Sequence, residues 1–152
     1  MIIIVTGTPG TGKTEFAKGF AEKNNITYLD GKEIIADNEL GEEYDEAGDC
    51  WVVDEEKFAE TCEEIIQEMK SRDESAIIDS HLSHHISSDL VDKCYVTICD
   101  ITELKERLEK RGYSESKVRE NLDAEIFKVC LTEAKEAGHN VEEVDTTTAT
   151  KR

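Results

Sequence analysis

Short aliphatic runs and longer amphipathic stretches alternate along the chain. The first run, Ile2–Val5, stops at a glycine-rich turn, as expected for a buried strand of a parallel sheet. Further short apolar segments predict four more strands, the last of them weakly patterned, at residues 26–29, 76–78, 95–99 and 141–144. This alternation predicts an α/β fold, with a parallel sheet and helices on both of its faces.

Four of the stretches between the strands predict helices, at residues 13–23, 54–70, 102–111 and a longer segment that starts at 114. Candidate N-caps are Asp54, Thr102 and Ser114. The expected apolar faces are formed by Phe16, Ala17 and Phe20 in the first helix, by Phe58, Cys62, Ile65 and Met69 in the second, and by Val118, Leu122, Ile126 and Val129 in the last.

One segment follows neither periodicity. Between Asp37 and Cys50 the chain holds seven acidic residues and no basic one, and Gly41 and Gly48 interrupt it. This composition predicts a loop or a mobile insert. Its charge is consistent either with a solvated loop or with a docking site for a basic protein.

Composition narrows the classes of function. A length of 152 residues fits one domain, and the lack of a long apolar run argues against a transmembrane helix or a signal peptide, so we expect a cytoplasmic protein. The 36 acidic and 18 basic residues give a net charge of −18, which argues against general nucleic-acid binding. The charge alone explains solubility, and it also suits basic proteins and metal cations. The five cysteines form no C-x-x-C pair and are expected to be reduced thiols.

The candidate chemistry begins where the first strand ends. Residues 7–14 read Gly-Thr-Pro-Gly-Thr-Gly-Lys-Thr and match the phosphate-binding motif G-x-x-x-x-G-K-[ST] in full. The motif stands between a predicted strand and a predicted helix, which is the context that it requires. Lys13 would then reach the β- and γ-phosphates of a nucleotide, and the Thr14 hydroxyl would bind Mg²⁺.

An acidic partner for this site is predicted at Asp79. It ends a strand expected to lie beside the first one, where a carboxylate would meet the Mg²⁺ or its water shell. The alternative is a residue that caps the next turn.

Three histidines follow, at positions 81, 84 and 85, and His81 is the one best placed beside the phosphates. If this stretch is helical, His81 and His85 are an i, i+4 pair, so a zinc site is conceivable. No cysteine or acidic residue is evidently placed to complete such a site, and the alternative is a set of exposed loop histidines.

Arginine is scarce, and Arg107 and Arg111 occupy one face of a predicted helix. They could supply the planar, permanently charged donors that a transferring phosphoryl group needs. They could equally form ordinary ion pairs with neighbouring glutamates of the helix.

Four elements together resemble the adenylate kinase 6 family, most closely its archaeal members, and the resemblance covers nearly the whole chain. These elements are Gly7–Thr14; Tyr44-Asp45-Glu46 leading to Val53-Asp54-Glu55; Ile78-Asp79-Ser80-His81; and the run Arg107–Tyr113, continuing through Lys117, Glu120-Asn121 and Glu125-Ile126-Phe127.

The resemblance implies a three-layer P-loop NTPase fold in a single domain over residues 1–152, with a five-stranded parallel sheet, a monophosphate arm at about 30–53 and a short lid at about 110–120. It implies ATP and Mg²⁺ as cofactors and AMP or a related monophosphate as acceptor. It assigns the ATP phosphates to Gly10, Gly12, Lys13, Thr14 and Glu15, matches Asp79 and His81 to the family's Asp-x-His element, and makes Arg111 the lid arginine that faces ATP.

Two features differ from the family pattern. Many adenylate kinases carry an arginine in the arm to hold the AMP phosphate, whereas here Lys32 is the only base in the corresponding stretch, Gly31–Ala36. Family members usually add a closing C-terminal helix after the fifth strand, whereas this chain ends soon after it.

Three functions follow from the resemblance. The first is an adenylate or nucleoside-monophosphate kinase with associated ATPase activity. The second is an ATPase switch in small ribosomal subunit assembly and rRNA maturation that binds a small-subunit platform ribosomal protein with a basic tail. The third is a nucleotide-sensing switch with little turnover.

Overall fold

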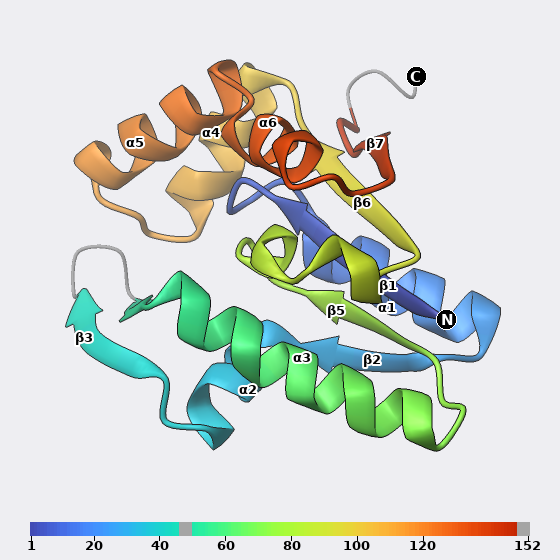
Figure 1. Cartoon of the computed structure of the whole chain (residues 1–152). Helices are drawn as coiled ribbons and strands as arrows, with labels where there is room; N and C mark the ends of the chain where they lie inside the picture. The colour runs from blue at the N-terminus through green and yellow to red at the C-terminus, as the bar shows by residue number, and fades with distance from the viewer. Residues whose placement is uncertain (46–49, 149–152) are drawn as a thin grey trace.

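The computed structural model describes residues 1–45 and 50–148, and its centre is a five-stranded parallel sheet (Figure 1). The strand order is β2-β5-β1-β6-β7, and each neighbouring pair is parallel, as the alternation of strands and helices predicted. The strands are β1 (Ile2–Gly7), β2 (Thr27–Asp30), β5 (Ala76–Asp79), β6 (Lys93–Ile98) and β7 (Val141–Asp145).

The helices found in the described part of the chain are α1 (Lys13–Asn24), α2 (Gly31–Asp37), α3 (Glu55–Ser71), α4 (Ile101–Lys110), α5 (Glu115–Ile126) and α6 (Val129–Glu136), with short 3-10 turns η1 (Ser83–His85) and η2 (Ser88–Leu90). None of these helices has the length and apolar character needed to cross a bilayer.

Alternate residues of β1 face two different helical layers. Ile3 and Val5 pack against α1, whereas Ile2 and Ile4 belong to a larger core that includes residues of α3 and α6. Both sets of side chains are almost wholly buried. This alternation accounts for the uninterrupted aliphatic run in the sequence, because a central parallel strand has two apolar faces to cover.

Helices α4 and α5 pack against each other at one end of the molecule (Figure 1). Their contact is a separate apolar cluster in which Leu104 and Leu108 of α4 meet Val118 and Leu122 of α5. The N-cap of α4 is Asp100, whose side chain accepts hydrogen bonds from two backbone N–H groups, and not Thr102 as predicted. Ser114 caps α5 as predicted.

The acidic segment predicted as a loop contains regular structure. After α2, the strands β3 (Gly41–Asp45) and β4 (Cys50–Val53) form an antiparallel hairpin that stands apart from the parallel sheet (Figure 1). Residues 46–49 lie outside the described residues. The loop prediction, made for residues 37–50, is therefore wrong for β3 and for the first residue of β4. The acidic composition gave no sign of this strand pairing.

The long helix predicted from Ser114 is divided in two. Lys128 has a positive φ of 52°, which no continuous right-handed helix allows, so α5 ends before it and α6 begins at Val129. Ile126 and Val129 were expected on the apolar face, but they are 53% and 39% exposed. In α3, Ile66 is fully buried and the predicted Ile65 only partly so.

Candidate active site

The turn between β1 and α1 requires glycine at two positions. Gly10 and Gly12 have φ angles of 93° and 90°, in the left-handed region that other residues occupy only with strain. A Cβ atom on Gly10 would also lie 2.9 Å from Leu108 Cδ2, so the loop runs close against α4. The loop leads directly into α1, whose N-terminal N–H groups and helix dipole favour an anionic ligand such as phosphate.

The side chain of Lys13 bends back into this loop. Its Nζ atom donates hydrogen bonds to the carbonyl oxygens of Gly7 (3.0 Å) and Thr8 (3.4 Å). Burial lowers the pKa of Lys13 to about 8, the Asp79 carboxylate opposes this change, and the positive charge of Arg111 adds to it. The charges of Asp79 and Arg111 therefore both act on Lys13.

Asp79 lies at the end of β5, where it is 5% exposed. One carboxylate oxygen, Oδ2, accepts a hydrogen bond from the Thr14 hydroxyl at 2.7 Å and another from the Tyr28 hydroxyl at 2.7 Å. A threonine hydroxyl and a carboxylate at this separation are the oxygen donors that Mg²⁺ prefers, so Thr14 and Asp79 fit that ion.

Tyr28 was missed by the sequence analysis. It lies on β2 and reaches Asp79 only because β2 and β5 pair in parallel, and no motif surrounds it. Burial and the hydrogen bond to Asp79 raise the pKa of Tyr28 above its usual value, so the hydroxyl stays protonated and continues to donate. The pairing order of the strands was the only signal that could have identified it.

Three other predicted site residues lie exposed around the loop. Glu15 is in the first turn of α1, Arg111 caps the end of α4, and His81 follows β5. His81 is exposed, but partial desolvation of its ring by the surrounding protein lowers its pKa. The positive charges of Lys13 and Lys32 lower this pKa further. The His81 imidazole is therefore neutral at pH 7.

Arg107 serves a different purpose from Arg111. It forms an ion pair with Glu103, and its guanidinium donates to the carbonyl oxygens of Gly10 (3.2 Å) and Thr146 (2.8 Å). Thr146 in turn donates to the carbonyl of Thr11 at 2.5 Å. For Arg107 the structure favours the ion-pair alternative, and the arginine supports the phosphate-binding loop from α4 and the end of β7.

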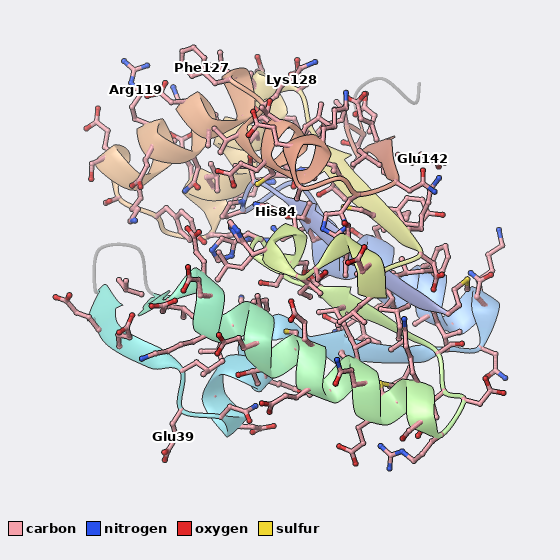
Figure 2. All side chains as sticks on the ribbon, in the orientation of Figure 1. Glu39, His84, Arg119, Phe127, Lys128 and Glu142 are labelled. Carbon is pink, nitrogen blue, oxygen red and sulfur yellow. The ribbon has the colours of Figure 1, made fainter. Side chains whose placement is uncertain are left out.

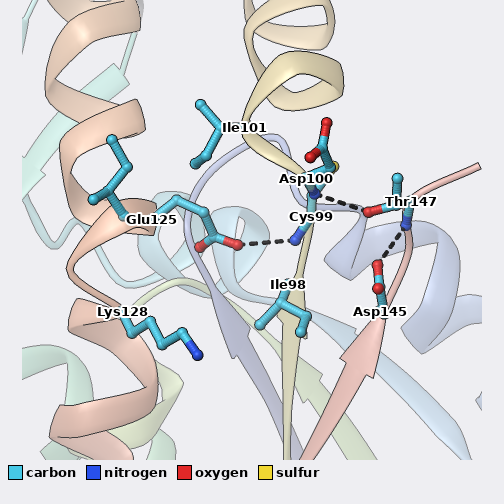
Figure 3. Close-up of a pocket in the computed structure, with 9 residues that line it drawn as sticks. Ile98, Cys99, Asp100, Ile101, Glu125, Lys128, Asp145 and Thr147 are labelled. Atoms are coloured by element: carbon cyan, nitrogen blue, oxygen red, sulfur yellow. Dashed lines mark hydrogen bonds between the residues drawn. The ribbon is translucent and has the colours of Figure 1, made fainter. Parts of the chain in front are cut away.

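Glu125 of α5 supports the same loop from another side. Its Oε1 atom accepts a hydrogen bond from the Thr8 hydroxyl at 2.9 Å, and its Oε2 atom accepts one from the Cys99 backbone N–H at 2.9 Å. Figure 3 shows Glu125 extending to Cys99 across an open cavity of about 510 Å³ that also borders Lys128 and Thr147. This volume lies within the range of small-molecule sites.

The three histidines form neither the conceivable pair of His81 and His85 nor a set of exposed loop histidines, since His84 is buried. Residues 83–85 make a 3-10 turn and not an α-helix, so the condition for an i, i+4 pair of His81 and His85 is not met. Instead, the donor atoms of His84, His85 and Glu133 lie within 4.8 Å of one another. The acidic member comes from α6, 49 residues beyond His84, which is why the sequence did not suggest it.

Comparison with known proteins identifies a matching family model and relatives of this chain. Residues 3–128 match the family model described as an AAA domain. A protein of Methanocaldococcus jannaschii named "Putative adenylate kinase" is 41% identical over 147 residues, covering 97% of this chain and 77% of that protein. A protein of Schizosaccharomyces pombe named "Adenylate kinase isoenzyme 6 homolog" is 38% identical over 135 residues, covering 89% of this chain and 74% of that protein.

Solved structures show the same fold. The shikimate kinase of Acinetobacter baumannii in complex with shikimate matches with a TM-score of 0.62 and 16% identity, covering 99% of this chain and 87% of that one. A sugar kinase of Janibacter sp. HTCC2649 matches with a TM-score of 0.60 and 18% identity, covering 95% and 84%. At these identities the similarity concerns the fold alone.

Proposed function

Because this chain belongs to the adenylate kinase 6 family of P-loop kinases, we propose a kinase activity. The chain would transfer the γ-phosphoryl group of ATP to AMP or a related nucleoside monophosphate. One observation carries the proposal: the Thr14 hydroxyl lies 2.7 Å from Asp79 Oδ2, next to a glycine-bounded loop that contains the Lys13 ammonium. Phosphoryl transfer needs this combination of a positioned cation and a metal-binding oxygen pair.

In the proposed reaction the loop positions the phosphates and Lys13 provides charge. Backbone N–H groups after Gly12 bind the phosphates of ATP, and Lys13 exchanges its hydrogen bonds with the carbonyls of Gly7 and Thr8 for the β- and γ-phosphates. Thr14 and Asp79 would hold Mg²⁺, which neutralises phosphate charge when bound. No covalent intermediate is needed, because the reaction depends mainly on positioning and electrostatic stabilisation.

Two exposed cations complete the proposed site. Arg111, at the start of the predicted lid, is assigned to the transferring phosphoryl group, since its charge already acts on Lys13. Lys32 is assigned to the acceptor phosphate, since it is the only base in Gly31–Ala36 and its charge acts on both Lys13 and His81.

The test is an assay with ATP and Mg²⁺, with and without each nucleoside monophosphate, that separates ADP formed by transfer from ADP formed by hydrolysis. We expect AMP or another monophosphate to divert most of the turnover into transfer. Asp79→Asn and Thr14→Val should lose transfer at least about a hundredfold. The matched control is Tyr28→Phe, which removes the other hydroxyl on Asp79 and should lose much less. Hydrolysis that no monophosphate alters would contradict the kinase proposal.

A second candidate is an ATPase switch that acts in small-subunit assembly by binding a basic ribosomal protein. The observation that favours it is the exposed acidic surface around β3, which includes Asp37, Glu39, Glu42 and Glu43. A surface of this charge beside a phosphate acceptor site would repel the incoming monophosphate, but it would attract a basic tail. In the same assay, this candidate predicts hydrolysis that rises when the ribosomal protein is added.

A further inference from the structure

A group of histidines and glutamates from η1, α3 and α6 lies outside the proposed phosphoryl-transfer machinery, and His84 of this group is labelled in Figure 2. His84 Nε2 is 2.7 Å from Glu133 Oε2, and His85 Nε2 is 3.9 Å from the same oxygen. His85 Nε2 also lies 3.4 Å from Glu55 Oε2, at the first turn of α3. Two imidazoles and the Glu133 carboxylate thus converge, and the Glu55 carboxylate lies beside His85.

The distances between these donor atoms fit a tetrahedral metal ion. With metal–nitrogen and metal–oxygen bonds of about 2.0–2.2 Å, the ligand atoms of a tetrahedral zinc site stand about 3.3–3.6 Å apart. Within the group of His84, His85 and Glu133, the separations of 2.7 and 3.9 Å lie on either side of that range, and all donor atoms are within 4.8 Å of one another. Shifts of well under about 1 Å in three side chains would bring their donors to bonding distance.

The surroundings of His84 are those of a metal ligand. The residue is 2% exposed, and its second ring nitrogen, Nδ1, lies 2.7 Å from the Thr6 hydroxyl. The Thr6 hydroxyl is also 3.3 Å from the His81 carbonyl oxygen, to which it can donate. With Thr6 donating to His81, the Nδ1 atom of His84 can donate to Thr6, and Zn²⁺ would replace the proton through which Nε2 bonds Glu133 at 2.7 Å.

The site also has an entrance and a suitable charge. An open cavity of about 370 Å³ borders His85 and is lined by Glu55, Glu56 and Glu60, so a cation approaches past carboxylates. Glu133 and Glu55 carry two negative charges, which match the charge of a divalent ion. Imidazole ligands favour Zn²⁺ over Mg²⁺ or Ca²⁺, both of which take oxygen ligands.

We propose that His84, His85 and Glu133 form a Zn²⁺ site, with Glu55 as the side chain nearest to the fourth position. The ion would connect η1, which follows the Asp79 strand, to α6 and to the start of α3. Because α3 begins just after the acidic hairpin, Zn²⁺ at this site restrains the base of that hairpin. This site is separate from Thr14 and Asp79, and the proposal does not depend on which reaction they carry out.

The experiment uses the whole protein, reduced and freed of metal, in buffer with excess Mg²⁺ to occupy oxygen sites. Zn²⁺ is titrated by calorimetry, and Co²⁺ is used as a spectroscopic probe. We expect one Zn²⁺ per chain and a rise in Tm of about 5–10 °C at a free Zn²⁺ concentration of about a hundred times Kd. Bound Co²⁺ should give the visible bands of four-coordinate nitrogen and oxygen ligation, without thiolate-to-cobalt charge transfer.

Glu133→Gln and His85→Ala should each weaken Zn²⁺ binding at least about tenfold, and Glu55→Gln should have a smaller effect. The matched control is Glu136→Gln, an exposed residue one turn further along α6, which should bind Zn²⁺ as the unmodified protein does. Glu133 has a side chain that is 44% exposed, so its variant remains informative if His85→Ala fails to fold. The absence of stoichiometric binding, thiolate bands with Co²⁺, or equal affinity in Glu133→Gln and Glu136→Gln would overturn the proposal.

Discussion

Lys13 is a residue whose proposed function opposes stability, because the charge that would bind phosphate is costly to bury. Burial lowers its pKa from 10.5 to about 8, which means that the folded protein disfavours the charged ammonium relative to the unfolded chain. The folded state therefore carries an electrostatic penalty at every pH below about 8, and this penalty fades as the pH rises from 8 to 10.5.

We predict that Lys13→Met raises the free energy of unfolding at pH 7 by about 1–3 kcal/mol while it removes phosphoryl transfer. The gain in stability should shrink as the pH rises above 8 and be small near pH 10.5, because the folded-state lysine is then neutral and the unfolded-state lysine is losing its proton. Urea unfolding at pH 7 and pH 10 measures both effects. The control is the exposed Lys32→Met, which should change stability little. A Lys13→Met variant that is less stable at pH 7 than the unmodified protein would contradict the prediction.

A second prediction at this scale concerns His81. Its lowered pKa leaves a neutral imidazole beside the charges of Lys13 and Lys32, where it can orient a water molecule or the acceptor. His81→Ala should lower the hydrolysis rate at saturating ATP by about tenfold or more, with a much smaller change in ATP affinity. His81→Gln, which keeps a hydrogen-bonding group, should recover part of the rate. Weaker ATP binding with an unchanged saturated rate would refute this role.

At the scale of one element, two arginines of α4 that look equivalent in the sequence have different surroundings in the structure. Arg107 is held by Glu103 and by the carbonyls of Gly10 and Thr146, whereas Arg111 ends the helix and is exposed. We predict that Arg107→Lys lowers the free energy of unfolding by about 1–2 kcal/mol, because a lysine cannot reproduce the planar set of donors.

Arg111→Lys should leave stability nearly unchanged and should lower kcat, because its expected partner is the transferring phosphoryl group. Thermal unfolding and steady-state kinetics on the two variants separate the roles, and each serves as the control for the other. An Arg111→Lys variant with the kcat of the unmodified protein would show that Arg111 is an ordinary solvated charge of the helix.

The elements also show how far the sequence could predict this structure. The five strands of the parallel sheet and the phosphate-binding loop follow from local patterns. The position of Asp79 follows as well, because the carboxyl ends of paired parallel strands lie side by side. The division of α5 from α6 escaped prediction, since Lys128 takes a left-handed conformation without the glycine that usually marks one. The contacts of Arg107 and Glu133 also escaped, because their partners lie far away in the sequence and only the folded chain brings them together.

At the scale of the whole molecule, the phosphate-binding loop is supported by distant parts of the chain. Arg107 of α4, Glu125 of α5 and Thr146 after β7 each bond to a backbone or side-chain group of the loop. The loop is therefore pre-organised before any ligand binds, which spares the nucleotide much of the entropic cost of ordering it. The side chains of Lys32 and Arg111, in contrast, are exposed.

The charge of the whole molecule leads to the last prediction. A net charge of −18 attracts basic proteins in general, but the cluster of acidic residues around β3 concentrates that field. If this surface binds the basic tail of a platform ribosomal protein, a Glu39→Gln/Glu42→Gln/Glu43→Gln variant should lose most of its affinity at low salt. Binding of the unmodified protein should weaken steeply as ionic strength rises past about 0.15 M, where the Debye length is about 8 Å. The matched control neutralises three exposed glutamates elsewhere, Glu22, Glu106 and Glu136, and changes the net charge equally. An equal loss of affinity in the two triple variants would show that only net charge matters. Affinity that is unchanged in both variants would show that the acidic hairpin is only a solvated surface.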